Sequence, residues 1–214
     1  MIDEQTEKPR SSFWKELPIL LGVAILVAVL VRAFVLQTFF IPSPSMENTL
    51  QIDDRVLVNK LVYDFRSPHR GEVIVFKAPT AWSGNPAGED FIKRVIGVAG
   101  DHVICCDRTG PKERLIINGK PLDEPYIYSA NGEQDKPADQ DFDITVPQGR
   151  LWVMGDHRSA SGDSLEHWQQ SGQDITEATI PEDQVVGRAF TIFWPVSRAT
   201  WLTVPKPFDA IPSP

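Results

Sequence analysis

The chain has 214 residues, a length that suits one domain of ordinary size carrying an inserted lobe rather than two full domains. Its 29 acidic and 21 basic residues give a formal net charge of -8, and without a basic cluster this charge excludes nucleic acid as a partner. Eighteen prolines and 14 glycines favour short strands joined by turns over a helical bundle, so we expect a mainly β protein.

Residues 1–16 form a polar leader, and an apolar stretch of 20 residues follows from Leu17 to Leu36. As a helix this stretch is about 30 Å long, which matches a bilayer core if Arg32 extends its head group to the boundary. Basic residues precede the stretch, which places the N-terminus in the cytoplasm and residues 37–204 outside: Lys8, Arg10 and Lys15. A cleavable signal peptide is the alternative, but no small-x-small site follows, so an uncleaved transmembrane helix is preferred.

Several later segments have the alternation or apolar character of strands and lack helical periodicity: 55–60, 72–76, 91–98, 151–154 and 185–194. Residues 101–147 differ in character and predict an inserted lobe, with a hairpin at 115–122 and a polar, mobile loop at 129–141. The proline-rich end, 205–214, is predicted to be disordered.

The two cysteines, Cys105 and Cys106, are adjacent. Neither their spacing nor the histidine pattern resembles a zinc site, so no metal is implied. A bridge between neighbouring residues needs a strained ring, which favours two free thiols or separate packing roles.

Ser45 is the candidate nucleophile because a stiff turn presents it directly after the apolar stretch. Pro44 fixes its own φ angle and restricts Ser43 to extended conformations. The Ser45 amide and the Ser43 hydroxyl are available as donors to a developing oxyanion. Taken alone, the segment also fits a proline-serine linker leaving a bilayer.

Lys93 is the candidate base, since it lies in a strand among apolar neighbours. A base must be neutral, and burial lowers the pKa of a lysine from its usual value of about 10.4. Arg94 points to the opposite side of the strand. The plain alternative is a pair of solvated cations on an edge strand.

A Ser-His-Asp site is a further alternative, because one polar segment holds several suitable residues: Asp156, His157, Ser161, Asp163 and Ser164. Triads are assembled from distant parts of a fold, so a turn of this composition is more typical of a loop bonded to itself.

Five segments, taken in order, resemble the motif boxes of bacterial type I signal peptidases: 41–50, 54–60, 70–76, 92–101 and 155–164. The resemblance implies a membrane-bound serine endopeptidase, without a cofactor, that removes signal peptides from exported preproteins after small residues of the Ala-x-Ala type. It implies a twisted antiparallel β domain of the signal-peptidase and repressor-protease kind, with an inserted β lobe and one transmembrane helix in the bacterial plasma membrane. The implied partners are secretory preproteins, membrane lipid and the export machinery.

By the same resemblance, Ser45 and Lys93 form the catalytic dyad, Ser43 and the Ser45 amide form the oxyanion hole, and Ser161 orients the lysine. The implied supporting charge network consists of Arg94, Asp156 and Asp163. Two residues depart from the family pattern: Pro44 stands where glycine is commonest, and Leu165 where an arginine often pairs with Asp163. Asp163 must then pair with Arg158, Arg94 or solvent.

Three other functions are consistent with parts of this pattern. A catalytically silent, membrane-anchored binding module of the same fold is one, although the chain keeps both Ser45 and Lys93. A self-cleaving serine-lysine repressor is another, but such a protein carries a DNA-binding unit where this chain has an apolar stretch. A relative dedicated to one exported substrate cannot be distinguished by sequence from a general processing enzyme.

Overall fold

The computed structural model describes residues 13–31, 35–86 and 88–214. The chain forms two compact units, Met1–Leu36 and Gln37–Pro214. The first contains helix α1 (Phe13–Leu30), whose side chains from residue 16 to residue 29 are exposed. Among the described residues, no helix has both the length and the apolar character that a bilayer crossing demands. The expected transmembrane span reaches Leu36, whereas helix α1 ends at Leu30 and Leu36 is the first residue of strand β1. Most of the expected leader, residues 1–16, lies outside the described residues.

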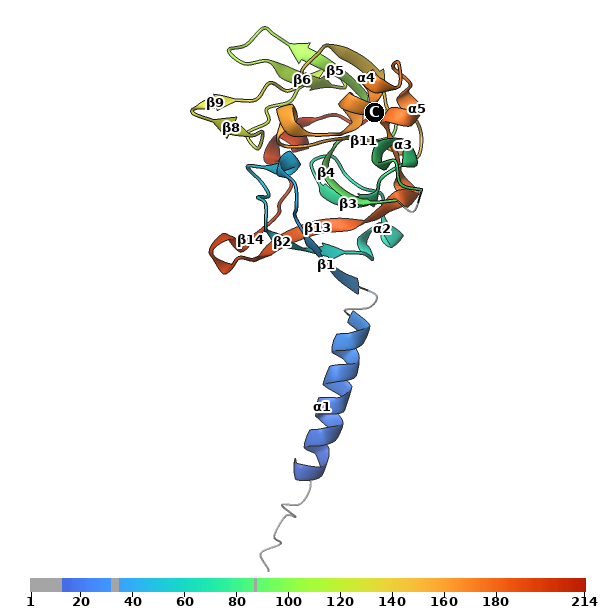
Figure 1. Ribbon diagram of the computed structural model, residues 1–214, viewed down its shortest axis with the longest axis vertical. Helices are drawn as coiled ribbons and strands as arrows, with labels where there is room; N and C mark the ends of the chain where they lie inside the picture. The colour runs from blue at the N-terminus through green and yellow to red at the C-terminus, as the bar shows by residue number, and fades with distance from the viewer. Residues whose placement is uncertain (1–12, 32–34, 87) are drawn as a thin grey trace, which may run out of the picture. The chain divides into compact units, whose positions relative to one another are not determined.

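The described part of the second unit is built on an eight-stranded sheet with the order β1-β2-β13-β3-β4-β11-β12 and β14 beside β13 (Figure 1). Its strands are β1 (Leu36–Phe40), β2 (Arg55–Asn59), β3 (Val73–Lys77), β4 (Asp90–Gly97), β11 (Arg150–Met154), β12 (Ile180–Pro181), β13 (Val185–Trp194) and β14 (Thr200–Trp201). Neighbours from β2 to β12 are antiparallel. The predicted mainly β, antiparallel fold is therefore confirmed.

Alternating and continuous apolar runs explain which faces of this sheet are buried. In β2, Val56 and Val58 are fully buried while Arg55 is exposed, which is the period of two expected of a strand with one core face. Strand β3 is buried from Val73 to Phe76, because apolar clusters cover both faces of the sheet there. The centre of the sheet is thus a rigid support for β4.

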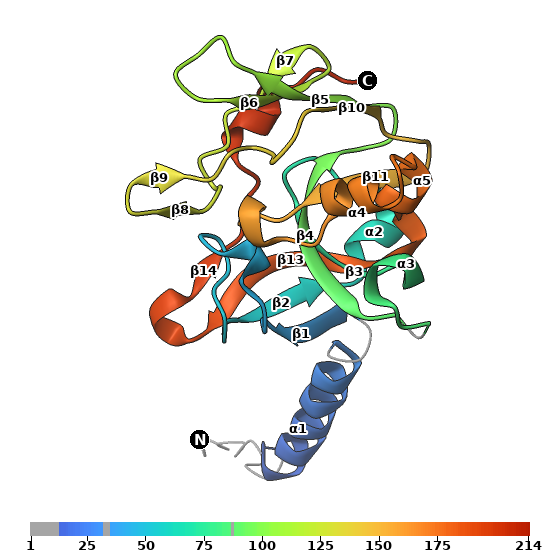
Figure 2. The same cartoon turned by 45° about the horizontal axis from the view of Figure 1, so that its top comes forward.

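Short helices connect and cover the strands, and their placement is visible in Figure 2. The α-helices of this unit are α2 (Val62–Phe65), α3 (Thr80–Ser83), α4 (Ser164–Gln170) and α5 (Ile175–Ala178). The 3-10 helices are η2 (Pro44–Met46), η3 (Arg158–Ala160), η4 (Glu182–Gln184), η5 (Val196–Arg198) and η6 (Lys206–Ala210). Helix α4 lies against β11, where Leu165 and Trp168 join the apolar core.

The segment expected to form an inserted lobe carries a second, four-stranded sheet with the order β10-β5-β6-β7. Its strands are β5 (His102–Asp107), β6 (Arg114–Ile117), β7 (Lys120–Pro121) and β10 (Phe142–Thr145). This sheet shares one apolar cluster with Trp152 and Met154 of β11, so the lobe is packed onto the main sheet rather than separate from it.

The polar segment predicted as a mobile loop at 129–141 begins with a small hairpin, β8 (Ser129–Ala130) and β9 (Glu133–Gln134). Its two turn residues, Asn131 and Gly132, both have positive φ angles, 55° and 86°. Asn-Gly readily adopts this conformation, and the resulting turn matches the twist of paired strands. A loop was therefore the wrong prediction at these positions.

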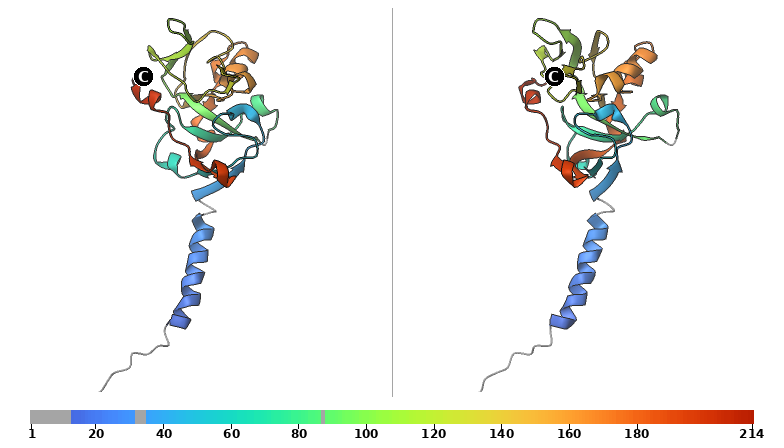
Figure 3. Two further views of the ribbon diagram at one scale, coloured as in Figure 1. Left: turned by 90° about the vertical axis from the view of Figure 1, so that its left-hand side faces the viewer. Right: turned by 60° about the vertical axis from the view of Figure 1, so that its left-hand side comes forward.

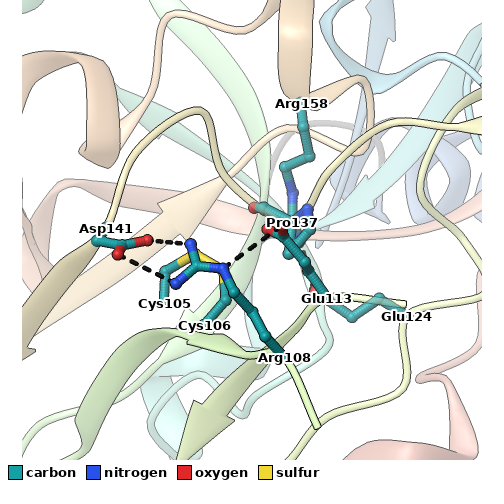
Figure 4. Close-up of a disulfide and its surroundings, with 8 residues drawn as sticks. All are labelled: Cys105, Cys106, Arg108, Glu113, Glu124, Pro137, Asp141 and Arg158. Carbon is teal, nitrogen blue, oxygen red and sulfur yellow. Dashed lines mark hydrogen bonds and ion pairs between the residues drawn. A yellow bond between two sulfur atoms is a disulfide. The ribbon is translucent and has the colours of Figure 1, made fainter. Parts of the chain in front are cut away.

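The two cysteines on β5 form a disulfide with each other, which corrects the expectation of free thiols or separate packing roles (Figure 4). Side chains of neighbouring residues in a regular strand point to opposite faces. The register between β5 and β6 shifts between Cys105 and Asp107, so the strand is irregular at this point. Nearby, Arg108 forms ion pairs with Asp141 and Glu113.

The C-terminal segment expected to be disordered, 205–214, is packed on the domain. Figure 3 shows it running past the main sheet to the second sheet. Helix η6 buries Phe208, which is 5% exposed, and Ile211 beyond it is 7% exposed. Composition alone suggested disorder, but two apolar side chains among the prolines have a place in the core.

Candidate active site

Ser45 lies in the 3-10 helix η2 and is buried, with 6% of its surface exposed. Pro44 occupies the first turn of this helix, where its missing N–H costs nothing, and Ser43 before it is extended (φ -123°, ψ 155°). Met46 and Leu50 are completely buried beneath the turn. The backbone around Ser45 is consequently fixed from both sides.

The amine of Lys93 lies within hydrogen-bonding distance of the Ser45 hydroxyl. Lys93 is on β4 opposite Ile74 of β3, and its Nζ is 2.8 Å from Ser45 Oγ and 3.2 Å from the carbonyl oxygen of Ile92. Burial lowers the pKa of Lys93 to about 8, against the opposing effect of nearby carboxylates such as Asp163. About a tenth of this amine is thus neutral at pH 7, far more than for an ordinary lysine, which suits it to accept a proton from the hydroxyl.

A cavity of about 410 Å³ adjoins this pair. Ser43, Ser45 and Lys93 line it together with apolar side chains, among them Phe39, Ile41, Val75, Ile92 and Ala160. Ser43 Oγ is 3.4 Å from Ser45 Oγ. The cavity therefore offers an extended, apolar chain segment a place beside a hydroxyl and an amine.

Ser161 lies close to Ser45 without the hydrogen bond to Lys93 that the resemblance implies. A Cβ atom built on Gly155 would be 2.3 Å from Ser161 Oγ and 2.4 Å from the Ser45 carbonyl oxygen, so only glycine fits between them. The buried Ser161 Oγ lies instead near the Asp163 carboxylate, where it acts to lower the pKa of that group. The structure thus brings Ser161 to the site, with its hydroxyl directed at Asp163 rather than at Lys93.

Arg94 and Asp156, two members of the expected charge network, form a buried ion pair with each other. Arg94 Nε is 2.8 Å from Asp156 Oδ1, and Nη2 is 2.5 Å from Oδ2. Thr49 donates to the same carboxylate, and the Tyr126 ring lies 4.1 Å from the guanidinium carbon. Burial lowers the pKa of Arg94, but the Asp156 carboxylate outweighs this effect and raises it, so the guanidinium stays charged. Sequence reasoning missed Thr49 and Tyr126, which carry no charge pattern.

Asp163 bonds to backbone amides rather than to an arginine, which corrects the expected pairing with Arg158, Arg94 or solvent. Its Oδ2 accepts from the Gly155 amide at 2.9 Å and its Oδ1 from the Leu165 amide at 3.1 Å. The second bond caps the N-terminus of helix α4. Burial raises the pKa of this carboxyl group, and two amide donors satisfy its oxygens without a cation.

Arg158 instead pairs with Glu124 of the inserted lobe, an acidic residue that sequence reasoning did not select. Both side chains are almost completely buried, at 2% and 4% exposure. Arg158 Nε also donates to the Gly155 carbonyl oxygen at 3.0 Å. The separation of 34 residues between the partners left no signal in the sequence.

The histidines do not form the Ser-His-Asp alternative. The His157 Nδ1 atom is 3.1 Å from Glu47 Oε2 and 3.2 Å from the Pro44 carbonyl oxygen. His167 is stacked on Trp82, with ring centroids 4.3 Å apart. The Asp156 carboxylate is occupied by Arg94, so no histidine in the described part of the chain links it to Ser45.

Comparison with known proteins identifies the family of this chain. Residues 14–194 match the family model described as signal peptidase, peptidase S26. A probable signal peptidase I of Mycobacterium leprae is 37% identical, covering 89% of this chain and 79% of the relative. A probable signal peptidase I-2 of Synechocystis is 36% identical, covering 94% and 82%. A signal peptidase I of Leptolyngbya laminosa is 38% identical, covering 88% and 83%.

The match extends over most of the chain and includes the turn with Ser45, strand β4 and the segment from Gly155 to Asp163. These parts are distant in sequence and meet at one cavity. The chain accordingly belongs to the signal peptidase family, peptidase S26, and is a serine endopeptidase.

Proposed function

We propose that this chain is a membrane-anchored signal peptidase that removes N-terminal signal peptides from exported preproteins with a dyad of Ser45 and Lys93. The observation that carries the proposal is the 2.8 Å contact between Lys93 Nζ and Ser45 Oγ, both buried at the edge of a cavity. A lysine in this environment needs no histidine to activate a serine, because burial already favours its neutral form.

In the proposed mechanism, neutral Lys93 takes the proton of Ser45 as its Oγ attacks the scissile carbonyl carbon. The Ser45 amide and the Ser43 hydroxyl then stabilise the negative oxygen of the tetrahedral intermediate. The protonated amine transfers its proton to the departing amino group, leaving an acyl-enzyme. Water, deprotonated by Lys93, releases the signal peptide and restores the serine.

Cleavage after small residues of the Ala-x-Ala type is part of the proposal. Bulky side chains of Phe39, Ile41 and Ile92 line the cavity beside Ser45 and limit the space for a substrate side chain. A small residue next to the scissile bond leaves its carbonyl carbon free to approach Ser45 Oγ. Secretory preproteins are the substrates we expect.

Attachment to the bacterial plasma membrane, with the N-terminus in the cytoplasm, completes the proposal. The apolar stretch from Leu17 to Leu36 and the basic residues before it support this topology. Trp194, Val196 and Trp201 are 52%, 71% and 70% exposed and suit contact with lipid. Resistance of the full chain to alkaline extraction from membranes tests the anchor; release into the soluble fraction would contradict it.

The dyad is tested by incubating the detergent-solubilised full chain with a precursor bearing Ala-x-Ala and comparing it with Ser45→Ala and Lys93→Ala. Cleavage by the parent and its loss by at least about a thousandfold in each variant is the expected result. Full activity of Lys93→Ala would remove the proposed base. A folded parent that cleaves none of several precursors would favour the silent binding module instead.

A further inference from the structure

One peptide unit contains both the Pro44 carbonyl group and the Ser45 N–H, which is the proposed donor to the oxyanion. In the planar trans peptide unit, the Pro44 carbonyl oxygen and the Ser45 N–H point in opposite directions. Whatever fixes the direction of the carbonyl therefore also fixes the direction of the N–H. The partners of the Pro44 carbonyl become relevant to catalysis for this reason.

Two donors hold the Pro44 carbonyl oxygen. The Glu47 amide lies 2.9 Å away and closes the 3-10 turn, and His157 Nδ1 lies 3.2 Å away from a distant segment of the chain. The backbone amide of His157 also donates to the Ser45 carbonyl oxygen at 3.1 Å. His157 thus contacts both consecutive carbonyl groups of the turn that carries the nucleophile.

The imidazole ring of His157 is itself held in place. The Tyr128 ring stacks on it with centroids 3.9 Å apart and an angle of 24° between the planes. Glu47 Oε2 is 3.1 Å from the same Nδ1, and the His157 side chain is 14% exposed. A carbonyl oxygen can only accept, so the contact with the Pro44 carbonyl oxygen places a hydrogen on Nδ1, and Glu47 Oε2 lies close enough to share it.

We propose that His157 is a positioning residue for the oxyanion hole, which aims the Ser45 N–H by holding the opposite end of its peptide unit. The inference rests on the proposed function, since it assumes that the Ser45 amide receives the developing charge. A hydrogen bond to the carbonyl also polarises the peptide and makes its N–H a stronger donor. The donor is then oriented before substrate arrives, which is the condition for effective electrostatic stabilisation.

Three substitutions in the full chain separate this role from simple packing. His157→Phe keeps a ring to stack on Tyr128 and removes the donor. His157→Asn has an amide nitrogen near the position of Nδ1, whereas the donor of His157→Gln extends toward the position of Nε2. We expect kcat to fall about 10- to 100-fold in the Phe and Gln variants, with KM within about twofold of the parent, because the lost contact acts on the transition state. The Asn variant should recover most of the parent's kcat.

The pH dependence of kcat/KM gives a second readout. Its acid limb should stay at the same pH in the Phe variant, since Lys93 keeps its surroundings. Parent-like kcat in the Phe variant would overturn the inference, as would equal activities of the Asn and Gln variants. If the Phe variant does not fold, the comparison of Asn with Gln decides alone. If the parent is folded but cleaves no faster than Ser45→Ala, both the proposed function and this inference are overturned. If the parent is active and His157→Phe is equally active, only the inference is overturned.

Discussion

Lys93 illustrates how position within a strand changes the chemistry of a single residue. It is 4% exposed, and the face of Phe91 lies 5.6 Å from its amine. Burial disfavours the ammonium form, while the carboxylates of Asp163, Asp156 and Glu166 favour it. Burial is the larger effect, so the pKa of the amine falls from its ordinary value to about 8.

This lowered pKa predicts the pH dependence of the enzyme. The proposed base acts in its neutral form, so kcat/KM should fall about tenfold for each pH unit below about 8 and level off above it. The measurement is hydrolysis of a soluble Ala-x-Ala peptide between pH 6 and 9.5. Thermal unfolding at each pH serves as the control for loss of folded protein. A rate that is constant across this range would contradict a lysine base with this pKa.

At the scale of elements, the inserted lobe holds the segments that carry the site. The Asn48 side chain, shortly after helix η2, donates to the Tyr126 carbonyl oxygen at 3.0 Å. The Tyr128 amide donates to the Asp156 carbonyl oxygen at 2.8 Å. The buried ion pair of Arg158 and Glu124 likewise joins the inserted lobe to the segment that follows Asp156. The lobe therefore stabilises the segments around Asn48 and from Asp156 to Arg158, and it also packs on the main sheet.

Replacing only one partner of the buried Arg158–Glu124 ion pair should destabilise the folded protein. Glu124→Leu and Arg158→Met each leave a charged partner buried, and we expect each to lower the free energy of unfolding by about 3 kcal/mol. The double variant Glu124→Leu with Arg158→Met removes both charges and should recover much of this loss. Urea denaturation of all variants checks the cycle. Additive losses in the double variant would contradict a direct interaction between the two side chains.

At the scale of the whole molecule, the C-terminal segment closes the core from outside. The Phe208 ring stacks at 6.0 Å on Tyr126, whose own ring covers Arg94 of the charge network. The Asn118 side chain donates to the Pro212 carbonyl oxygen at 3.0 Å. Gly71 has a positive φ angle of 81°, and a Cβ atom there would be 2.6 Å from the Phe208 ring. The chain's end is thus fitted closely to distant parts of the domain.

Removal of the Phe208 ring measures how much the C-terminal segment contributes to the stability of the domain. Phe208→Ala should lower the free energy of unfolding by about 3 to 4 kcal/mol, because it removes a buried aromatic side chain and leaves a cavity. Phe65→Ala is the matched control: that ring is 85% exposed, and we expect a change below about 0.5 kcal/mol. Chemical denaturation compares the two. Equal, small effects would mean that the C-terminal segment does not contribute to the folded core.

Local patterns in the sequence were sufficient for most of the sheet. The alternation at 55–60 and the apolar run at 72–76 correspond to β2 and β3 within one or two residues. Such periodicity depends only on residues that are neighbours in the sequence, so it predicts a strand even when the strands paired with it are unknown. The predictions that failed concern segments of mixed composition, such as the proline-rich end with its buried Phe208.

The sequence alone determined the strand pattern, the stiff turn around Ser45 and, through the order of its motifs, Lys93 as the expected partner of Ser45. Only the tertiary structure decided how the charges pair. Asp163 bonds to amides, Arg158 takes Glu124, and His157 reaches the Pro44 carbonyl group. The physical reason is that a buried polar group bonds to whichever donor or acceptor the fold brings within about 3 Å, whether that neighbour is close in the chain, like the Leu165 amide, or distant, like Glu124.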